Sequence, residues 1–178
     1  MTGAATVRPA DPSEIPQLAA LAARTFPLAC PPGTEDADIR HFVSTALSEN
    51  AFRGYLADDE RRVLIAERDG TLVGYTMLGL RPSEDPDVRA AVRDTPAVEV
   101  NKMYADPAAH GSGAAGALMQ AAVDLARELD RASLWLGVNH VNARAQAFYR
   151  KCGFVPVGHR RFALGDVLHE DFVYERVL

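Results

Sequence analysis

The segment HGSGAAG, residues 110–116, has the residue types and spacing of a phosphate-binding loop. Gly111, Gly113 and Gly116 form a G-x-G-x-x-G pattern just before a stretch with helical periodicity. A glycine-rich turn that opens a helix directs free backbone N–H groups at one point, where the positive end of the helix dipole also acts. The pattern therefore predicts a diphosphate site, against the alternative of a glycine-rich helix start that binds nothing.

The glycine spacing alone also fits a dinucleotide-binding loop, but its surroundings exclude one. Such a loop needs an acidic residue about 20 residues beyond the glycines, at the end of the next strand. Here that strand ends Leu134-Trp135-Leu136-Gly137-Val138-Asn139, without Asp or Glu. A Walker loop is excluded as well, because no G-K-[ST] follows the glycines. A hydride-transferring or nucleotide-hydrolysing protein is therefore disfavoured.

Periodicity and turn residues predict the elements that must position this loop. A strand is expected at Val98–Tyr104, and a helix that carries Leu118, Ala122, Leu125 and Leu129 on one face should follow and end near Glu128. The next expected elements are a strand at Ser133–Val138 and a helix that Asn142 caps and Gly153 closes. The loop therefore joins a strand to a helix in the middle of the chain.

The rest of the chain predicts further strands with helices among them. Asp11-Pro12 is expected to start a helix, and Asp69-Gly70 a hairpin turn. Arg81–Pro96 is expected to be a mobile surface loop, because it holds three prolines and four acidic residues. The other expected elements are strands at Thr6–Arg8, Arg62–Glu67, Leu72–Leu80, Phe154–Gly158 and Leu168–Arg176, and helices at Asp36–Leu47 and Ser48–Leu56. This order predicts an α/β (α+β) fold with one mixed sheet.

Composition limits the classes of function. The chain has 178 residues and a formal net charge of −5, which suits a single domain and argues against a nucleic-acid-binding surface. Two cysteines and five histidines show no metal-ligand spacing, so no metal site is expected. The start MTGAATVRPADPSE lacks an apolar signal segment, and no apolar run is long enough to cross a membrane. We therefore expect a cytoplasmic protein that binds neither nucleic acid nor membrane.

Two motifs give the chain a specific resemblance. His110–Ala115 resembles the coenzyme motif [Q/R]-x-x-G-x-[G/A] of the GNAT superfamily of acyl-CoA N-acyltransferases, with His in place of Gln or Arg. The segment NARAQAFYRKCGF, residues 142–154, matches a second family block at every named position. The tail FALGDVLHEDFVYERVL, with WLGVN, is most similar to the bacterial spermidine/spermine N-acetyltransferase branch.

The resemblance implies a fold and a reaction. A GNAT-like fold has a mostly antiparallel central sheet of about six or seven strands flanked by helices. Residues 1–60 would form the substrate side, and residues 61–178 the acyl-CoA-binding core of one domain. The implied reaction moves an acetyl group from acetyl-CoA, as cosubstrate, to a primary amine. Backbone amides of the loop would then hold the coenzyme diphosphate.

The resemblance also assigns roles to individual residues. Tyr149 would be the proton donor to the coenzyme sulfur, and Glu99 the general base, with Asn101 on the same strand face. A core aromatic and an exposed strand carboxylate are the alternatives for these two. The implied coenzyme-binding residues are Met103, Tyr104, Ala105, His110, Gly111, Ser112, Gly113, Ala114, Ala115, Gly116, Asn142, Tyr149 and Lys151.

The acceptor stays open at this level. A small-molecule amine or a polyamine is the leading expectation, since Asp36, Asp38, Glu84, Asp85 and Asp87 could attract a polycation or could simply be solvated surface. Acetylation of a protein N-terminus or of an aminoglycoside-like compound, and a non-catalytic acyl-CoA-sensing module, are the alternatives. Dimers are frequent among similar proteins, so a homodimer is compatible with the resemblance.

Overall fold

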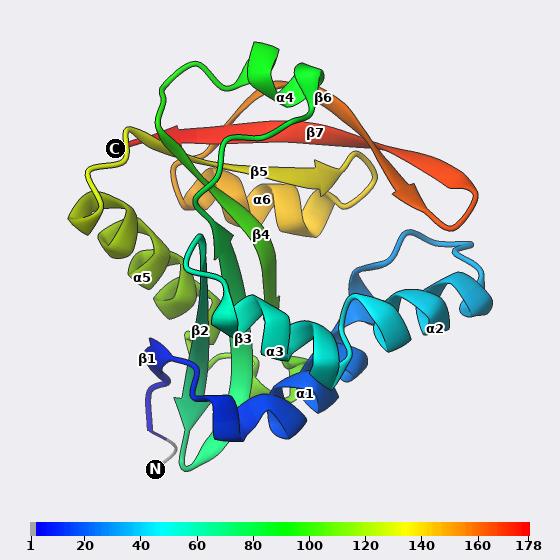
Figure 1. Cartoon of the computed structure of the whole chain (residues 1–178), viewed down its shortest axis with the longest axis vertical. Helices are drawn as coiled ribbons and strands as arrows, with labels where there is room; N and C mark the ends of the chain where they lie inside the picture. Colours follow the sequence, from blue (N-terminus) through cyan, green and yellow to red (C-terminus); the bar gives the residue numbers. More distant parts are fainter. Residues whose placement is uncertain (1–2) are drawn as a thin grey trace. The chain divides into compact units, whose positions relative to one another are not determined.

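A computed structural model describes residues 3–178 as a seven-stranded mixed sheet with helices on it (Figure 1). The strand order is β1-β2-β3-β4-β5-β7-β6. The strands are β1 (Thr6–Pro9), β2 (Arg61–Arg68), β3 (Thr71–Gly79), β4 (Ala97–Ala105), β5 (Ser133–Asn139), β6 (Val155–Leu164) and β7 (Val167–Val177). The α-helices are α1 (Ile15–Ala29), α2 (Asp36–Thr45), α3 (Glu49–Ala57), α4 (Pro86–Ala91), α5 (Ala114–Glu128) and α6 (Ala143–Lys151), and the 3-10 helices are η1 (Pro12–Glu14) and η2 (Pro107–Ala109). The predicted fold class is confirmed.

The chain contacts divide into two compact units. The first unit contains the residues up to Leu78 together with Lys102–Ala122. The second unit contains Gly79–Asn101 and Val123–Leu178. Each unit has buried apolar side chains of its own.

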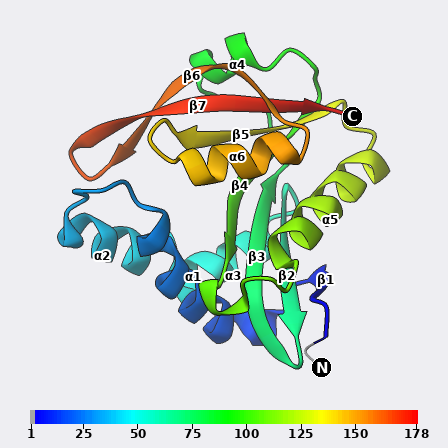
Figure 2. The same cartoon turned by 180° about the vertical axis from the view of Figure 1, so that it is seen from behind.

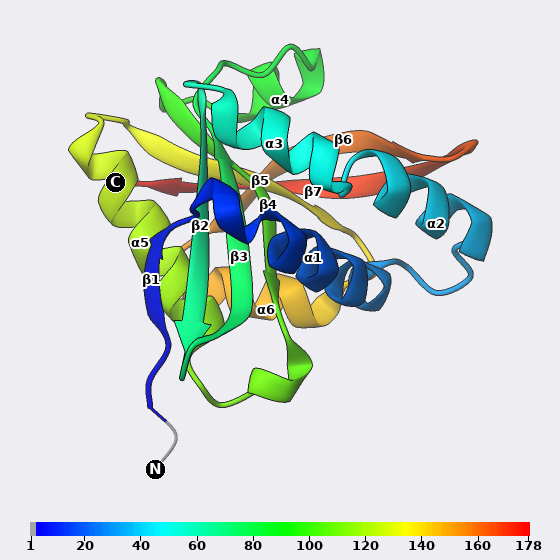
Figure 3. The ribbon, with the colours of Figure 1, turned by 60° about the horizontal axis from the view of Figure 1, so that its bottom comes forward.

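In the first unit, helices lie on one face of β2 and β3 (Figure 3). The chain enters α1 through a capping box in which the Asp11 side chain accepts from Ser13 N and the Glu14 side chain accepts from Asp11 N, as the Asp11-Pro12 signal predicts. The apolar face of α1 includes Leu18 and Phe26, which are buried. Helix α1 contacts α3, whose Phe52 is fully buried. These contacts fix the first unit's core.

In the second unit, β5, β7 and β6 carry α4 on one face and α6 on the other (Figure 2). Val88 and Val92 pack against Trp135 and Val173 on the α4 face. On the opposite face, the Tyr174 hydroxyl donates to Oε1 of Gln146 in α6 at 3.3 Å. The middle of this unit's sheet, at Trp135 and Tyr174, is therefore buried on both faces.

The prediction of a mobile loop over Arg81–Pro96 is wrong. Within it, α4 begins after Asp85, whose side chain accepts from Asp87 N, and Pro86 occupies the first turn. Val88 is 1% exposed, because α4 packs onto the sheet. A six-residue helix is too short to show periodicity in the sequence, so composition alone is misleading here.

The last hairpin is longer than the sequence pattern predicts. β6 pairs with β7 over its whole length, from Val155↔Glu175 to Leu164↔Val167, with a register shift between Pro156 and Gly158. Main-chain hydrogen bonds continue the ladder through polar residues such as His159 and Arg161. These residues break the alternation of apolar and polar side chains, so the sequence pattern does not reveal the full strand. Among residues 3–178, no helix combines the length and apolar character needed to cross a bilayer; the first two residues lie outside this description.

Candidate active site

The glycine loop of the first unit joins η2 to α5. The Asp106 side chain caps η2 by accepting from Ala108 N at 2.9 Å. Gly111 and Gly113 then adopt φ angles of 82° and 75°, in the left-handed region that favours glycine. These two reversals turn the chain into α5, whose first helical hydrogen bond runs from Ala117 N to Gly113 O at 2.9 Å. The predicted loop-to-helix geometry is present.

The backbone amides of this loop are available to a ligand. In the described part of the chain, the N–H groups of Gly111, Gly113, Ala115 and Gly116 donate to no other residue, whereas Ala114 N donates to Oγ of Ser112 at 3.3 Å. A Cβ placed at Gly111, Gly113 or Gly116 would meet no atom within 4 Å, so the glycines border open space. The residues present therefore fit a diphosphate group at the start of α5.

The end of β4 leads directly into this loop. The aromatic ring of Tyr104 contacts Tyr75 and Phe26, with ring centroids 5.7 and 6.4 Å apart. Asp106 N donates to Val73 O at 2.8 Å and thereby ties the loop to β3. The main chain of Met103–Ala105 is thus held in a fixed position in the first unit, next to the loop that it precedes.

Tyr149 lies on α6 of the second unit. Its half-buried ring contacts Phe148 and Phe154, with centroids 5.4 and 6.0 Å apart. Burial raises the pKa of Tyr149 to about 12. The hydroxyl therefore keeps its proton throughout the physiological pH range and can donate a hydrogen bond.

The two other predicted coenzyme contacts on α6 lie at its ends. The Asn142 side chain caps the helix by accepting from Ala145 N at 3.1 Å. Lys151 is exposed in the last turn. Asn142 therefore has the structural role that its position in the sequence allows, and its amide N–H₂ still offers two donors.

Glu99 and Asn101 share one face of β4, as strand alternation predicts. Nδ2 of Asn101 donates to Oε1 of Glu99 at 3.0 Å. A Cβ at Gly79 would lie 3.4 Å from Oε2 of Glu99, so the glycine leaves room beside the carboxylate. Glu99 is half-buried and positioned by these neighbours, which a general base requires.

Two charged residues on this face were missed by sequence reasoning. In the parallel register of β4 and β5, Glu99 is opposite Trp135. The Arg160 guanidinium lies 5.4 Å from the centre of the Trp135 ring and pairs with Asp171 at 3.3 Å. Burial raises the pKa of Asp171, and Arg160 opposes that shift. The Glu99 face therefore also carries an ion pair from the last hairpin.

One sequence signal for this arrangement is the glycine inside β5. A Cβ at Gly137 would collide with the guanidinium of Arg160. A glycine within a strand often marks such a close approach. The signal shows that something approaches Gly137 but not which residue, since Arg160 is distant in the sequence.

The predicted site residues thus gather in two groups. The first unit holds the loop and Met103–Ala105, and the second holds Glu99 and the α6 residues. Glu99 belongs to the α4 face of the sheet, whereas α6 with Tyr149 covers the opposite face. No group of three or more His, Cys, Asp or Glu side chains among residues 3–178 could hold a metal ion.

Comparison with known proteins identifies the family. The model of the acetyltransferase (GNAT) family matches residues 17–154. An uncharacterized N-acetyltransferase of Mycobacterium tuberculosis is 45% identical over 162 residues, which are 91% of this chain and 96% of the relative. The chain belongs to the acetyltransferase (GNAT) family. It is therefore classed as an N-acetyltransferase.

Solved structures of the family share the fold. PaiA N-acetyltransferase from Thermoplasma acidophilum, in complex with coenzyme A, has a TM-score of 0.79 and 16% identity, and the match covers 98% of this chain and 99% of that protein. YncA from Salmonella typhimurium, solved with its cofactor acetyl-CoA, has a TM-score of 0.65 and 19% identity, and the match covers 98% of this chain and 94% of that protein. At these identities the likeness establishes the GNAT fold.

Proposed function

We propose that this protein transfers an acetyl group from acetyl-CoA directly to the primary amine of a small molecule. The observation that carries the proposal is the set of unpaired amides at the start of α5, in a chain of the GNAT family. These amides hold the coenzyme diphosphate, together with Ser112 and the exposed His110. The main chain of Met103–Ala105 pairs with the pantetheine arm as an added strand would. Asn142 and Lys151 contribute hydrogen bonds to the same coenzyme.

Glu99 acts as the general base in this proposal. An alkylamine with a lysine-like pKa of about 10.4 arrives protonated, and exposing its lone pair at pH 7 costs about 4–5 kcal/mol. Glu99 accepts that proton, directly or through a water that Asn101 positions. Acetyl-CoA supplies the acetyl thioester, whose C–S bond breaks as the new C–N bond forms. The products are the acetamide and coenzyme A.

Tyr149 stabilises the departing sulfur. With a pKa of about 12, the Tyr149 hydroxyl keeps its proton and donates a hydrogen bond to the developing thiolate. Complete proton transfer is opposed, because a thiol with a pKa of about 8.5 is the stronger acid. The nitrogen releases its second proton to solvent once the C–N bond has formed, and the coenzyme thiolate takes its proton from solvent as it leaves. Glu99 lies on one face of the second unit's sheet, and α6 with Tyr149 covers the opposite face. In this proposal the base and the hydrogen-bond donor to sulfur therefore approach the thioester from opposite sides.

A polyamine is one candidate acceptor, suggested by the tail motif and by acidic residues. In the structure, Asp85 caps α4, and Asp36 and Asp38 lie in the first turn of α2. Carboxylates at these positions stabilise helix starts, so each has a structural role without a ligand. The acidic residues therefore give little support to a polyamine over other amines.

Acetyl-CoA should stabilise the protein against heat. At 100 times its Kd, a ligand that binds only the native state adds about 2.7 kcal/mol, which raises Tm by roughly 5–10 °C for a chain of this size. Differential scanning fluorimetry with acetyl-CoA, coenzyme A and NAD checks this. A shift with NAD and none with acetyl-CoA would contradict the proposal.

Replacing Glu99 by glutamine should lower kcat/KM for the amine about 100-fold at pH 7, because the proton acceptor is lost. The deficit should shrink as the pH approaches the amine's pKa of about 10.4, where the free base forms without help. The rate of coenzyme A release is measured as a function of pH for the wild-type protein and for the Glu99→Gln and Glu128→Gln variants. Glu128 is an exposed α5 carboxylate, so its variant should behave as wild type. Equal rates in all three proteins would remove Glu99 from the mechanism.

A further inference from the structure

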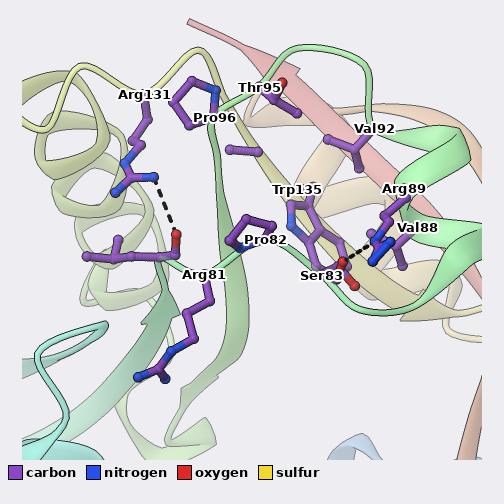
Figure 4. A pocket seen from close by; sticks show the side chains of 12 residues that line it. Arg81, Pro82, Ser83, Val88, Arg89, Val92, Thr95, Pro96, Arg131 and Trp135 are labelled. Atoms are coloured by element: carbon purple, nitrogen blue, oxygen red, sulfur yellow. Dashed lines mark hydrogen bonds between the residues drawn. The ribbon is translucent and has the colours of Figure 1, made fainter.

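The second unit contains a cavity beneath α4, which we call the α4 pocket (Figure 4). Its volume is about 140 Å³. Most of its wall is apolar and comes from Leu80, Pro82, Val88, Val92, Pro96, Ala97 and Trp135. Val88 and Val92 are buried against Trp135. The packing that holds α4 on the sheet therefore also forms one wall of the cavity.

The α4 pocket adjoins the candidate base. Ala97 precedes Glu99 by two residues and shares its face of β4. Trp135 is opposite Glu99 in the register of β4 with β5. Leu80 follows Gly79, whose missing side chain leaves room beside the Glu99 carboxylate. Three residues of the pocket wall are therefore immediate neighbours of Glu99. A substrate whose side group fills the pocket would place its amine beside the Glu99 carboxylate.

The size of the α4 pocket suits a ring or a branched alkyl group. A cavity of about 150 Å³ with apolar walls accommodates benzene. The apolar area that such a group buries stabilises its complex by about 25 cal/mol for each Å². A linear polyamine would instead place a charged or hydrated segment against these walls, at a desolvation cost.

The charged groups that line the α4 pocket are all cationic, beside the neutral hydroxyls of Ser83 and Thr95. Arg131 and Arg89 lie on opposite sides of Trp135 and Pro82, whereas the Arg81 side chain extends away from Trp135 (Figure 4). Nη1 of Arg131 donates to Leu80 O at 3.3 Å, but its Nε is buried and has no hydrogen-bond partner among the described residues. None of the lining residues among the described part of the chain carries a carboxylate. The arginine side chains around the pocket therefore repel a second ammonium group on the substrate.

We propose that the α4 pocket receives the apolar side group, an aromatic ring or a branched chain, of an acceptor amine that carries a single positive charge. This assignment rests on the proposed acetyl transfer, since Glu99 takes the proton of that amine. The substrate would then be an arylalkylamine or a branched alkylamine. A linear polyamine would not fill this pocket.

The single tryptophan of the chain allows a direct test, because Trp135 lines the α4 pocket. Phenethylamine, ethylamine and spermidine are titrated into the full-length wild-type protein while Trp135 fluorescence is followed. We expect a saturable change with phenethylamine alone. In coenzyme-release assays, kcat/KM should favour phenethylamine over ethylamine about 10- to 100-fold, as one apolar group in a fitted pocket allows.

A matched pair of variants adds the specificity test. Ala97→Leu fills the α4 pocket and should reduce the phenethylamine-to-ethylamine ratio about tenfold and abolish the fluorescence change. Ala90→Leu adds the same atoms to an exposed position of α4 outside the pocket and should leave both unchanged. A higher kcat/KM for spermidine, or an unchanged ratio in folded Ala97→Leu, overturns the inference.

Failure of the inference and failure of the proposed function give different results. Coenzyme release from amines without any phenethylamine-dependent change in Trp135 fluorescence refutes the pocket assignment and keeps the acetyltransferase. A saturable fluorescence change without coenzyme release from any amine refutes the acceptor role of the pocket and the proposed reaction together. Because the titration uses the wild-type protein, the result does not depend on how the variants fold.

Discussion

Replacing Tyr149 by phenylalanine is expected to lower kcat about 100-fold and to leave the Kd for acetyl-CoA unchanged. The variant removes one hydroxyl and keeps the ring that contacts Phe148 and Phe154. Loss of a preorganised donor to developing charge typically costs about 100- to 1000-fold in rate. Single-turnover kinetics and isothermal titration with acetyl-CoA separate the chemical step from binding.

Tyr174→Phe is the matched control for this experiment. It also removes a hydroxyl in the second unit, one that donates to Gln146 at 3.3 Å. The loss of that buried hydrogen bond should lower the free energy of unfolding by about 1 kcal/mol and leave kcat unchanged. If Tyr149→Phe has the kcat of wild type, the tyrosine is a packing residue and not the donor.

The pH profile tests the same role. Because burial raises the pKa of Tyr149 to about 12, the donor form is retained from neutral pH to beyond pH 11. Tyr149 should therefore cause no alkaline decline of kcat below about pH 11, although an ordinary tyrosine ionises near pH 10. The contribution of Tyr149 to stability is complete below pH 10 and is lost as the pH rises towards 12.

Replacing Gly113 by valine should weaken acetyl-CoA binding about tenfold or more, equivalent to about 1.4 kcal/mol. The φ angle of 75° at Gly113 disfavours a β-branched residue, and the side chain would project into the open space that the free amides face. Both effects disturb the N–H groups that we propose to hold the diphosphate. Equilibrium titration with acetyl-CoA and coenzyme A measures the loss.

Gly33→Val separates backbone strain from the loss of the site. Gly33 has a φ angle of 82° and no atom within 4 Å of a Cβ, as at Gly113, but it lies in the connection before α2. Both variants should lose about 1–3 kcal/mol of stability from strain. Only Gly113→Val should bind acetyl-CoA more weakly; equal affinity in the two variants would show that the glycine loop does not hold the coenzyme.

Local patterns predicted much of the fold and of the candidate site. The Asp11 cap, the Asp69-Gly70 turn and the glycine loop each depend on residues within a few positions of one another, and all are present. The hydrogen bond between Glu99 and Asn101 follows from strand alternation over two residues. Such features are legible because their physical causes act within one turn or one strand.

The structure of segment 81–96 could not be predicted from local patterns. Its prolines and acidic residues resemble a loop, and only the burial of Val88 and Val92 against Trp135 makes α4 part of the core. The position of Arg160 over Trp135 is another such case, since it requires β6, β7 and β5 to pair first. These contacts join residues that are distant in the chain, and no local pattern encodes them.

The sequence by itself thus determined the family motifs, the glycine loop that we propose to bind the diphosphate and the residue types available for acid–base chemistry, because these are properties of short segments. The tertiary structure alone decided that Glu99 shares its face with Trp135, Arg160 and an apolar cavity. The physical reason is that a cavity is bounded by side chains from several elements, and its shape and charge exist only once those elements pack. The acceptor preference that we propose depends on that packing, whereas the proposed coenzyme site depends mainly on the backbone of one loop.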